Sequence, residues 1–431
     1  MTTDMHPFAP VSASTALSRL QLVWLAAAVF FVSAGYGALM PLLPGWLTLL
    51  MPGASASELA RHVGFLSGAY AAGVLVGAPM WGIVSDRVGR GRILIIGLVG
   101  YVASLLTLLV AEWGSLWMIY ALRGATGFFV AAVIPVVSAL VAEHTLERQR
   151  ARRFAWLSAM SLLGFLFGPG LGALAGWLGQ IVGEEASPAA LSAQAAIGLS
   201  ALLGAVIMMG LAVTLPAPPG LVPAVGRIAA TTQGRMTVLY GLNAAVMFVL
   251  AGFELGILLQ GQQHPGVSAQ QVSLMFAECS LVMLGVNALL FFTALLEKVP
   301  SRKLIGAGLL LAMVGLAVLT QHRADAWMYF GVSLTAAGIG LILPVIAYLA
   351  AGAAPHKLGL AMGGLPAAAG IGQTLGSSAG GWLFGIVEQL SFGWLAAPLA
   401  GVALLLLARP RWGSAIRGQF GTPLGPREVE G

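Results

Sequence analysis

Charge is scarce in this sequence. Only 8% of its 431 residues are Asp, Glu, Lys or Arg, whereas soluble domains carry about 25%. The chain is 58% hydrophobic and has a mean hydropathy of +0.92. A soluble protein of this composition would expose large apolar patches and aggregate. The composition therefore excludes a soluble domain and indicates that the apolar surface faces a lipid bilayer.

Several kinds of site are also excluded. The single cysteine, Cys279, rules out an intramolecular disulfide and a thiolate metal centre. The six histidines fall near the ends of apolar runs or in polar segments, so we expect no metal site and no cofactor. A phosphate-binding Gly-Lys-Ser/Thr loop is absent, which excludes ATP as the direct energy source. Paired acids for metal–diphosphate chemistry and a nucleophile with its base are absent too, so we expect no enzyme. The basic residues form short scattered clusters, which argues against nucleic acid as a partner.

Long apolar runs dominate what remains. A membrane-spanning helix needs about 20 apolar residues, and continuous runs, unlike alternating ones, favour helices over a β-barrel. The first run is too long for the core of a secretory signal, so we interpret it as a retained span. The twelve predicted spans are 21–49, 63–84, 93–111, 115–141, 154–178, 189–214, 237–260, 270–296, 303–320, 326–350, 358–387 and 392–409.

The basic residues predict the orientation. If the N-terminus is cytoplasmic, the inner segments hold 18 Lys and Arg residues and the outer loops hold 2, Arg61 and Arg323. Because cytoplasmic loops are enriched in Lys and Arg, we expect a multi-pass protein of the cell (inner) membrane with both termini cytoplasmic. The predicted divisions are an N-terminal tail (1–20), a six-helix bundle (21–214), a proline-rich linker (215–236), a second six-helix bundle (237–409) and a C-terminal tail (410–431).

Two features repeat between the halves. The segment DRVGRGRIL (86–94) resembles EKVPSRKLI (297–305), 211 residues later. Glycines four residues apart precede a Trp-Leu pair in the fifth span of each half: Gly164, Gly168, Gly172 and Gly176, and then Gly372, Gly376 and Gly380. Such a stripe lies on one helix face and allows a neighbouring helix to approach closely. The repetition indicates two duplicated bundles, which is a transporter architecture.

Four motifs make residues 20–410 resemble a twelve-span member of the major facilitator superfamily, and the drug:proton antiporters in particular. The first is Gly82 followed by Asp86, Arg87, Val88, Gly89 and Arg90 between spans two and three, although Gly91 stands where the family has a basic residue. The second is Arg123 with Gly127 in span four. The third is the antiporter pattern Gly164, Gly168, Pro169 and Gly172, in which Ala173 replaces the last glycine. The fourth is GYGALMPLLP (35–44) in span one.

The resemblance implies an all-α membrane protein with twelve transmembrane helices in two pseudo-symmetric six-helix bundles, the major facilitator fold. It implies alternating access, proton-coupled export of small, partly apolar compounds, and a monomer as the functional unit. It also implies a cytoplasmic gate of Gly82, Asp86, Arg87, Gly89, Arg90 and Glu143. Export of one metabolite such as a siderophore, or import or uniport of a nutrient, stays open as an alternative. The glycine–proline pattern of span five argues against import.

Three ionisable residues lie within spans: Arg123, Glu254 and Glu278. Charge is costly in hydrocarbon, so these residues are candidates for proton coupling. At 1.5 Å per residue, the two glutamates lie at similar depth on spans seven and eight. If they are close together, one keeps its proton near neutral pH. The alternatives are that Arg123 only bonds backbone carbonyls and that the glutamates reach toward headgroups.

A substrate cavity is expected on spans one, four, seven and ten, which line it in the resembling family. Asn243 and Met247 share one face of span seven with Glu254. Aromatic and methionine surfaces suit large apolar substrates. The alternative for each aromatic is that it packs in a core or faces lipid. The further cavity candidates are Tyr36, Phe128, Phe129, Phe253, Tyr348 and Gln373.

Overall fold

The chain is described by a computed structural model over residues 17–110, 115–145, 147–182, 188–215, 230–264, 267–293, 295–321, 325–353 and 358–408. These residues are helical apart from short turns and caps. Most of the two predicted tails and most of the predicted linker lie outside these ranges.

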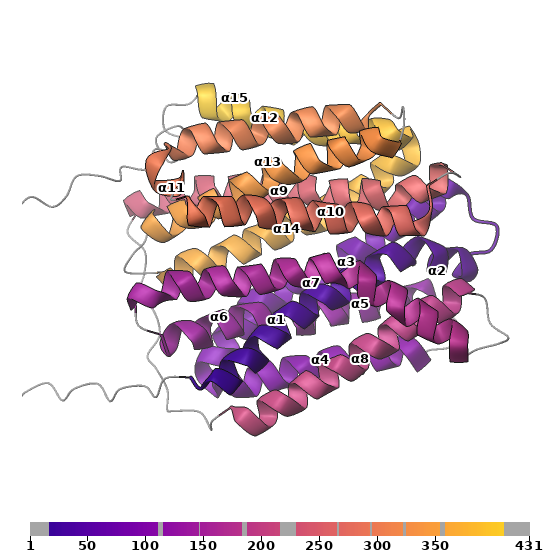
Figure 1. The fold of residues 1–431 in the computed structure, drawn as a ribbon, viewed down its shortest axis with the longest axis horizontal. Helices are drawn as coiled ribbons and strands as arrows, with labels where there is room; N and C mark the ends of the chain where they lie inside the picture. Colours follow the sequence, from indigo (N-terminus) through magenta and orange to yellow (C-terminus); the bar gives the residue numbers. More distant parts are fainter. Residues whose placement is uncertain are drawn as a thin grey trace, which may run out of the picture.

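The first half of the chain folds into six spans (Figure 1). Span one is divided into three pieces and span four into two. The elements are α1 (Arg19–Leu39), η1 (Met40–Leu42), α2 (Leu43–Leu50), α3 (Ala56–Val88), α4 (Arg90–Val110), α5 (Leu116–Val130), α6 (Val133–Glu143), α7 (Glu147–Val182) and α8 (Pro188–Thr214).

The second half also contains six spans. The beginning of α1 and the end of α15 lie at the same end of the molecule (Figure 1), as an even number of spans requires. The elements are α9 (Ala230–Gln263), α10 (Ala269–Phe292), α11 (Leu295–Lys298), α12 (Ser301–Leu319), α13 (Asp325–Ala353), α14 (Leu358–Val387), η3 (Glu388–Leu390) and α15 (Ser391–Ala408).

The structure bears out the predicted span count. Ten stretches of the described helices are long and apolar enough to cross a membrane. One of them, Gly364–Ala408, contains both α14 and α15, and α7 contributes the shorter apolar segment Trp156–Gly168. Separating α14 from α15 and adding α7 gives the twelve spans. Several helices extend past their apolar cores, because polar first turns continue them at the membrane surface.

Local sequence explains where the helices begin and break. Ser18, Ser55 and Ser268 each cap a helix through a reciprocal bond with a Gln or Glu three residues later. Proline lacks the N–H that an α-helix needs. Pro41 lies in the 3₁₀ turn that divides span one, and Pro135 follows the turn at 131–132 that divides span four.

In each half, the glycine stripe allows two helices to pack closely together. A Cβ added at Gly164 would lie 2.2 Å from the carbonyl oxygen of Phe30 in α1. A Cβ added at Gly376 would lie 2.1 Å from the carbonyl oxygen of Phe248 in α9. In both halves the fifth span therefore packs its backbone onto the first, as the repeat predicts. Gly168 and Gly172 continue the first contact, and Gly372 and Gly380 continue the second. The surroundings of the Pro169 side chain lie outside the described residues.

The halves meet where α3 packs on α14 and where α7 packs on α10. The α3–α14 contact is closest between Ser57 and Gly64 of α3 and Gly381 and Gly385 of α14. A Cβ at Gly381 would lie 2.6 Å from both the carbonyl oxygen of Ala60 and the Cα of Gly64. We call this region the Ser57 end. It is the side that the sequence predicts to face outward, and the bundles are in backbone contact there.

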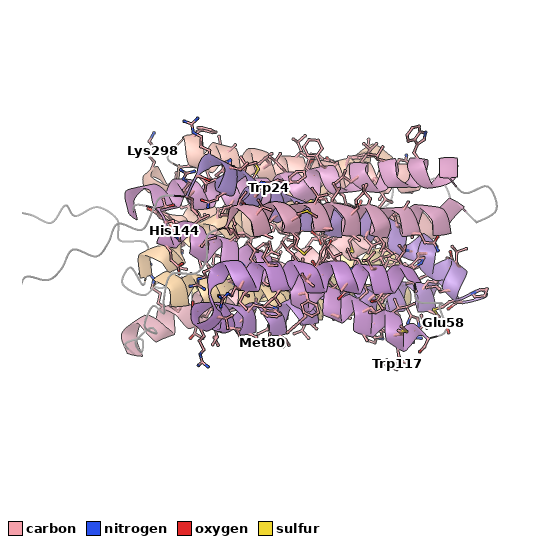
Figure 2. All side chains as sticks on the ribbon, turned by 90° about the horizontal axis from the view of Figure 1, so that it is seen from below. Trp24, Glu58, Met80, Trp117, His144 and Lys298 are labelled. Atoms are coloured by element: carbon pink, nitrogen blue, oxygen red, sulfur yellow. The ribbon has the colours of Figure 1, made fainter. Side chains whose placement is uncertain are left out.

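Apart from Arg123, Glu254 and Glu278, the described charged side chains lie toward the two ends of the helices. Figure 2 shows Glu58 and Trp117 at the Ser57 end and His144 and Lys298 at the opposite end. We call the opposite end the Arg90 end. Large apolar side chains such as Trp117, Phe292 and Val213 are 81% exposed on the outer surface of the bundles. This distribution is that of a protein whose sides face lipid.

Candidate functional site

Arg123 lies in α5, one turn before the close α3–α5 contact at Gly127, and points into the first bundle. Its side chain is only 2% exposed. The guanidinium carbon lies 4.9 Å from the centre of the Tyr70 ring, which is a cation–π contact. Its Nε and Nη2 atoms have no hydrogen-bond partner. Arg123 is therefore a buried cation held by an aromatic face and not by a carboxylate.

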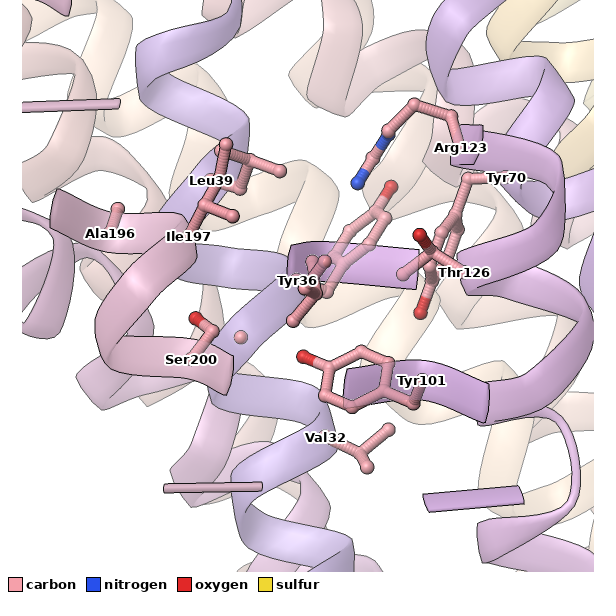
Figure 3. Close-up of a pocket in the computed structure, with 12 residues that line it drawn as sticks. Val32, Tyr36, Leu39, Tyr70, Tyr101, Arg123, Thr126, Ala196, Ile197 and Ser200 are labelled. Carbon is pink, nitrogen blue, oxygen red and sulfur yellow. The ribbon is translucent and has the colours of Figure 1, made fainter. Parts of the chain in front are cut away.

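Three tyrosines surround this guanidinium. Tyr36 of α1, Tyr70 of α3 and Tyr101 of α4 all interact electrostatically with Arg123. The Tyr36 and Tyr70 rings are 5.0 Å apart. Together with Ser200 of α8 they line a cavity of about 10 Å³ beside Arg123 (Figure 3). The cavity belongs to the first bundle alone.

Glu254 lies on α9, which contacts α3 of the first bundle. Its carboxylate interacts electrostatically with the Tyr36 hydroxyl of α1 and with the thiol of Cys279 in α10. Tyr36 in turn interacts with Arg123. The order Arg123, Tyr36, Glu254 therefore connects the cation of one half to an acid of the other.

Glu278 has different surroundings. Its Oε1 atom accepts a hydrogen bond from the Ser333 hydroxyl of α13, and its Oε2 atom is buried without a partner. The residues that it contacts in this way belong to the second bundle. Glu254 and Glu278 both interact with Cys279, but the described contacts include no hydrogen bond between the two carboxylates. Glu278 therefore has a hydrogen-bond partner of its own on α13, and a proton shared between the two acids stays a prediction.

Several residues expected in a substrate cavity pack within a bundle instead. Phe253 is 0% exposed and packs against Phe392 of α15. Phe129 fills the space beside Gly100 of α4. Phe128 contacts Trp81 of α3. In this conformation these aromatics pack on side chains of their own bundles, and their contribution to a central cavity stays a prediction.

The remaining candidates for the substrate cavity differ in their surroundings. The buried Asn243 amide donates to the carbonyl oxygen of Leu365, which ties α9 to α14. This bond gives Asn243 a structural partner. Met247, Tyr348 and Gln373 are half-buried on α9, α13 and α14. They remain candidates for substrate contact.

Sequence reasoning did not select Tyr70, Tyr101, Ser200 or Ser333. Each is a single hydroxyl in an apolar run, which is common and costs little in a membrane helix. The pseudo-symmetry of the halves was the available signal for Ser333. The repeat offset of 211 residues places it one residue from the counterpart of Arg123.

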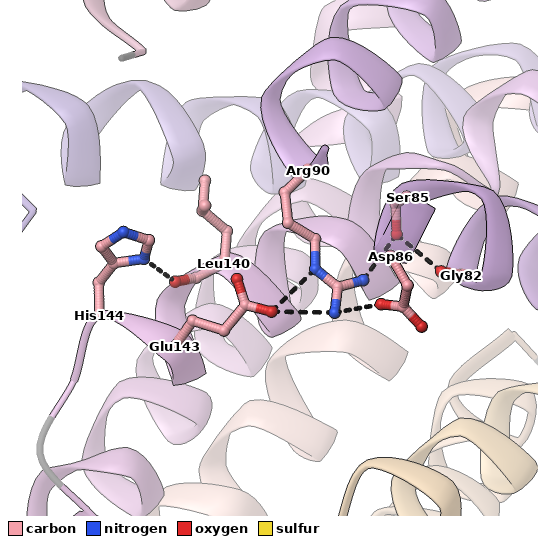
Figure 4. A network of polar contacts seen from close by, with 7 residues as sticks. All are labelled: Gly82, Ser85, Asp86, Arg90, Leu140, Glu143 and His144. Carbon is pink, nitrogen blue, oxygen red and sulfur yellow. Dashed lines mark hydrogen bonds and ion pairs between the residues drawn. The ribbon is translucent and has the colours of Figure 1, made fainter. Parts of the chain in front are cut away.

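At the Arg90 end, three polar side chains converge on Arg90 (Figure 4). Its Nη2 atom pairs with Asp86 and, at 3.0 Å, with Glu143. Its Nη1 atom donates to the Ser85 hydroxyl, which donates to the carbonyl oxygen of Gly82. The network joins the end of α3 and the start of α4 to the end of α6. Arg87, beside Asp86, is exposed.

The two glycines of this loop differ. Gly89 ends α3 with φ at +106°, a conformation that side-chain-bearing residues rarely adopt, and so allows α4 to start at the next residue. Gly82 was expected to allow close approach of a helix. A Cβ added there would meet no atom within 4 Å, so this close approach is absent in the present conformation.

We expect Asp86→Asn to leave expression intact and to slow transport by up to about fivefold, the range of an exposed ion pair. The substitution removes one of the two carboxylates that hold Arg90. The measurement is the initial transport rate per amount of protein in the membrane. Glu58→Gln is the matched control, because Gln also caps a helix and Glu58 lies at the other end. A normal rate for Asp86→Asn would show that the charges around Arg90 only determine the orientation of the chain in the membrane.

Comparison with known proteins agrees with this architecture. A family model described as Major Facilitator Superfamily matches residues 25–284 and 236–428. The chain is 39% identical over 145 residues to the class B tetracycline resistance protein of Escherichia coli. It is 31% identical over 144 residues to the quinolone resistance protein NorA of Staphylococcus aureus. The first match covers 33% of this chain and 34% of the relative, and the second covers 33% and 35%. The chain thus matches about a third of the length of these relatives.

The fold is also that of solved transporters. The structure of a peptide transporter, POT, in complex with sulfate superposes with a TM-score of 0.71 at 14% identity. The superposition covers 94% of this chain and 99% of that one. At this identity the likeness concerns the fold alone.

Proposed function

The chain belongs to the Major Facilitator Superfamily, and we propose that it is a proton-coupled exporter of small, partly apolar organic compounds. Its membership makes it a multi-pass membrane transporter and not an enzyme. Export, proton coupling and the class of substrate are the proposal.

The position of Glu254 carries the proposal. It is the one acid among the described spans that interacts with a residue of the other half, Tyr36. A carboxylate between two rocking bundles meets a different environment in each state. Because a buried carboxylate is costly when ionised, gain or loss of a proton at Glu254 changes the relative free energies of the two states. Proton binding can therefore drive the conformational exchange.

Tyr36 and Arg123 complete this coupling. The Tyr36 hydroxyl interacts electrostatically with both the Glu254 carboxylate and the Arg123 guanidinium. An ionised Glu254 is attracted toward the cation of the first bundle, whereas a protonated Glu254 is not. The bundles are thereby drawn together or released at this point according to the proton.

Two further observations support export. The glycine pattern of α7 packs onto α1 at Gly164, Gly168 and Gly172, which gives the antiporter motif a structural basis. The curated relatives include proteins named for resistance to tetracycline and to quinolone, which are organic compounds. These names support an organic substrate.

We further propose that the carrier lies in the cell (inner) membrane as a functional monomer, with both termini and the Arg90 end in the cytoplasm. The distribution of Lys and Arg supports this orientation, because 18 fall in the segments of that side and 2 in the others. The Arg90 network then lies on the cytoplasmic side, and the close α3–α14 contact on the outer side.

The test is accumulation of a fluorescent lipophilic dye in cells that express the wild-type chain. We expect these cells to hold less dye than cells with an empty vector. A protonophore should remove the difference, because it collapses the proton gradient without affecting ATP directly. Expression of Glu254→Gln, checked for equal protein in the membrane, should match the empty vector. Reduced accumulation that persists in the protonophore would contradict proton coupling.

A further inference from the structure

Arg123 carries a charge that no described acid of its own bundle balances. The described acids of the first half, Glu58, Asp86, Glu143 and Glu147, all lie at or near helix ends. Among the described residues, no ion pair involves Arg123. A guanidinium stays protonated in proteins. A buried ion without a counter-charge is strongly destabilising.

The free donors of Arg123 border a cavity. Its Nε and Nη2 atoms have no partner, and its side chain is among those that line the cavity. The hydroxyls of Tyr36, Tyr70, Tyr101 and Ser200 come from four other helices of the same bundle (Figure 3). The Thr126 hydroxyl also borders it but donates to the carbonyl oxygen of Leu122. The lining therefore offers a cation and several O–H donors, and no carboxylate.

The size of the cavity limits its occupant. A volume of about 10 Å³ accommodates a single water-sized particle. The carboxylate of an organic substrate does not fit, and the cavity lies inside one bundle and not between the two. A water molecule can satisfy the hydrogen bonds but leaves the charge of Arg123 unbalanced. A monatomic anion does both.

We infer that this cavity binds a small monovalent anion, chloride, which neutralises Arg123 within the first bundle. The guanidinium supplies the charge and two donors, and the tyrosine and serine hydroxyls complete the shell. Binding there does not require substrate or a proton gradient. A bound chloride would weaken the attraction between Arg123 and an ionised Glu254, but its binding is tested on the purified protein alone, so a failed test leaves the proposed function untouched.

The experiment measures the midpoint of thermal unfolding, Tm, of the wild-type protein in detergent without substrate. Sodium chloride is compared with sodium gluconate at equal ionic strength. A ligand that binds only the folded state raises Tm with its concentration, so we expect a saturable rise of about 2 °C or more in chloride. Bromide should act like chloride, because its radius is only slightly larger. Equal Tm values in chloride and gluconate would overturn the inference and leave water as the occupant.

Matched variants locate the effect. We expect Ser200→Ala and Tyr101→Phe to raise the chloride concentration for half-maximal stabilisation several-fold. Ser104→Ala is the control, because Ser104 is a similarly buried serine that donates to the carbonyl oxygen of Gly100 and does not line the cavity. Arg123→Gln should abolish the chloride response. If that variant does not fold, the two hydroxyl variants still test whether the anion lies in this cavity. An unchanged half-maximal concentration in both would place the anion elsewhere and contradict the assignment.

Discussion

Glu254→Gln is expected to reduce transport driven by a pH gradient to the level of protein-free vesicles. Glutamine has the shape of protonated glutamate but cannot release a proton, so the variant keeps one charge state throughout the cycle. The pH gradient then cannot change the protonation of a side chain at the interface of the two halves. The candidate substrate contacts Met247, Tyr348 and Gln373 are unchanged, so substrate binding should persist. The measurement compares uptake into proteoliposomes, with and without an imposed gradient, for the wild-type and variant proteins.

Glu278→Gln is the matched control for this prediction. Both glutamates lie in apolar spans and both interact with Cys279. Among the described residues, Glu254 interacts electrostatically with Tyr36 of the other bundle, whereas Glu278 accepts from Ser333 within its own. We expect Glu278→Gln to slow transport without uncoupling it from the gradient. The reverse pattern, with Glu278→Gln uncoupled and Glu254→Gln coupled, would assign the proton to Glu278.

Gly381→Val is expected to abolish transport by holding the Ser57 end open. A Cβ at this position would lie 2.6 Å from the carbonyl oxygen of Ala60 and from the Cα of Gly64. These are backbone atoms of α3, so the two helices must separate to accept a side chain. The contact joins the bundles and does not build either one. The protein should therefore fold but fail to close on this side, and alternating access should stop.

The labelling rate of the single cysteine of the chain measures this opening. Cys279 is 5% exposed and is in electrostatic contact with Glu254. A membrane-impermeant thiol reagent applied from the Ser57 end should label Cys279 faster in Gly381→Val than in wild type. Gly306→Val on α12 is the control, because an added Cβ there meets no atom within 4 Å. Wild-type transport and labelling in Gly381→Val would show that the closed contact is not part of the cycle.

The number and order of the spans follow from the sequence because hydrocarbon imposes a minimum length of apolar residues on every crossing. The glycine stripes were predictable for a similar reason. Only a residue without a side chain permits the backbone approach seen at Gly164 and Gly376. The pairing of Arg90 with Glu143 also agrees with the expectation, since few acidic residues are available at that end.

The rotation of each helix was not predictable. In a soluble protein an apolar stripe marks the buried face, but lipid is as apolar as a core, so a spanning helix can be hydrophobic all round. For this reason the sequence could not tell that Phe253 turns into its own bundle or that Phe129 fills the space beside Gly100. It also could not tell that Arg123 points toward Tyr70 and Tyr101. The face that each helix turns toward its neighbours depends on contacts between helices that are distant in the chain.

The conformational state was also not predictable from the sequence. Gly82 has open space around it, whereas Gly64 and Gly381 are in backbone contact. The sequence contains glycines at both ends of α3 and gives no indication of which are in contact at a given moment. Alternating access implies that such contacts exchange during the cycle.

Proton movement driven by substrate is the most direct test of the central claim. Proteoliposomes containing the purified protein and a trapped pH indicator, with no initial pH difference, receive a transported compound on one side. Coupled exchange predicts that protons move opposite to the compound, that a protonophore dissipates the resulting pH difference, and that Glu254→Gln produces none. Transport of the compound by the wild-type protein without any change in internal pH would contradict the account.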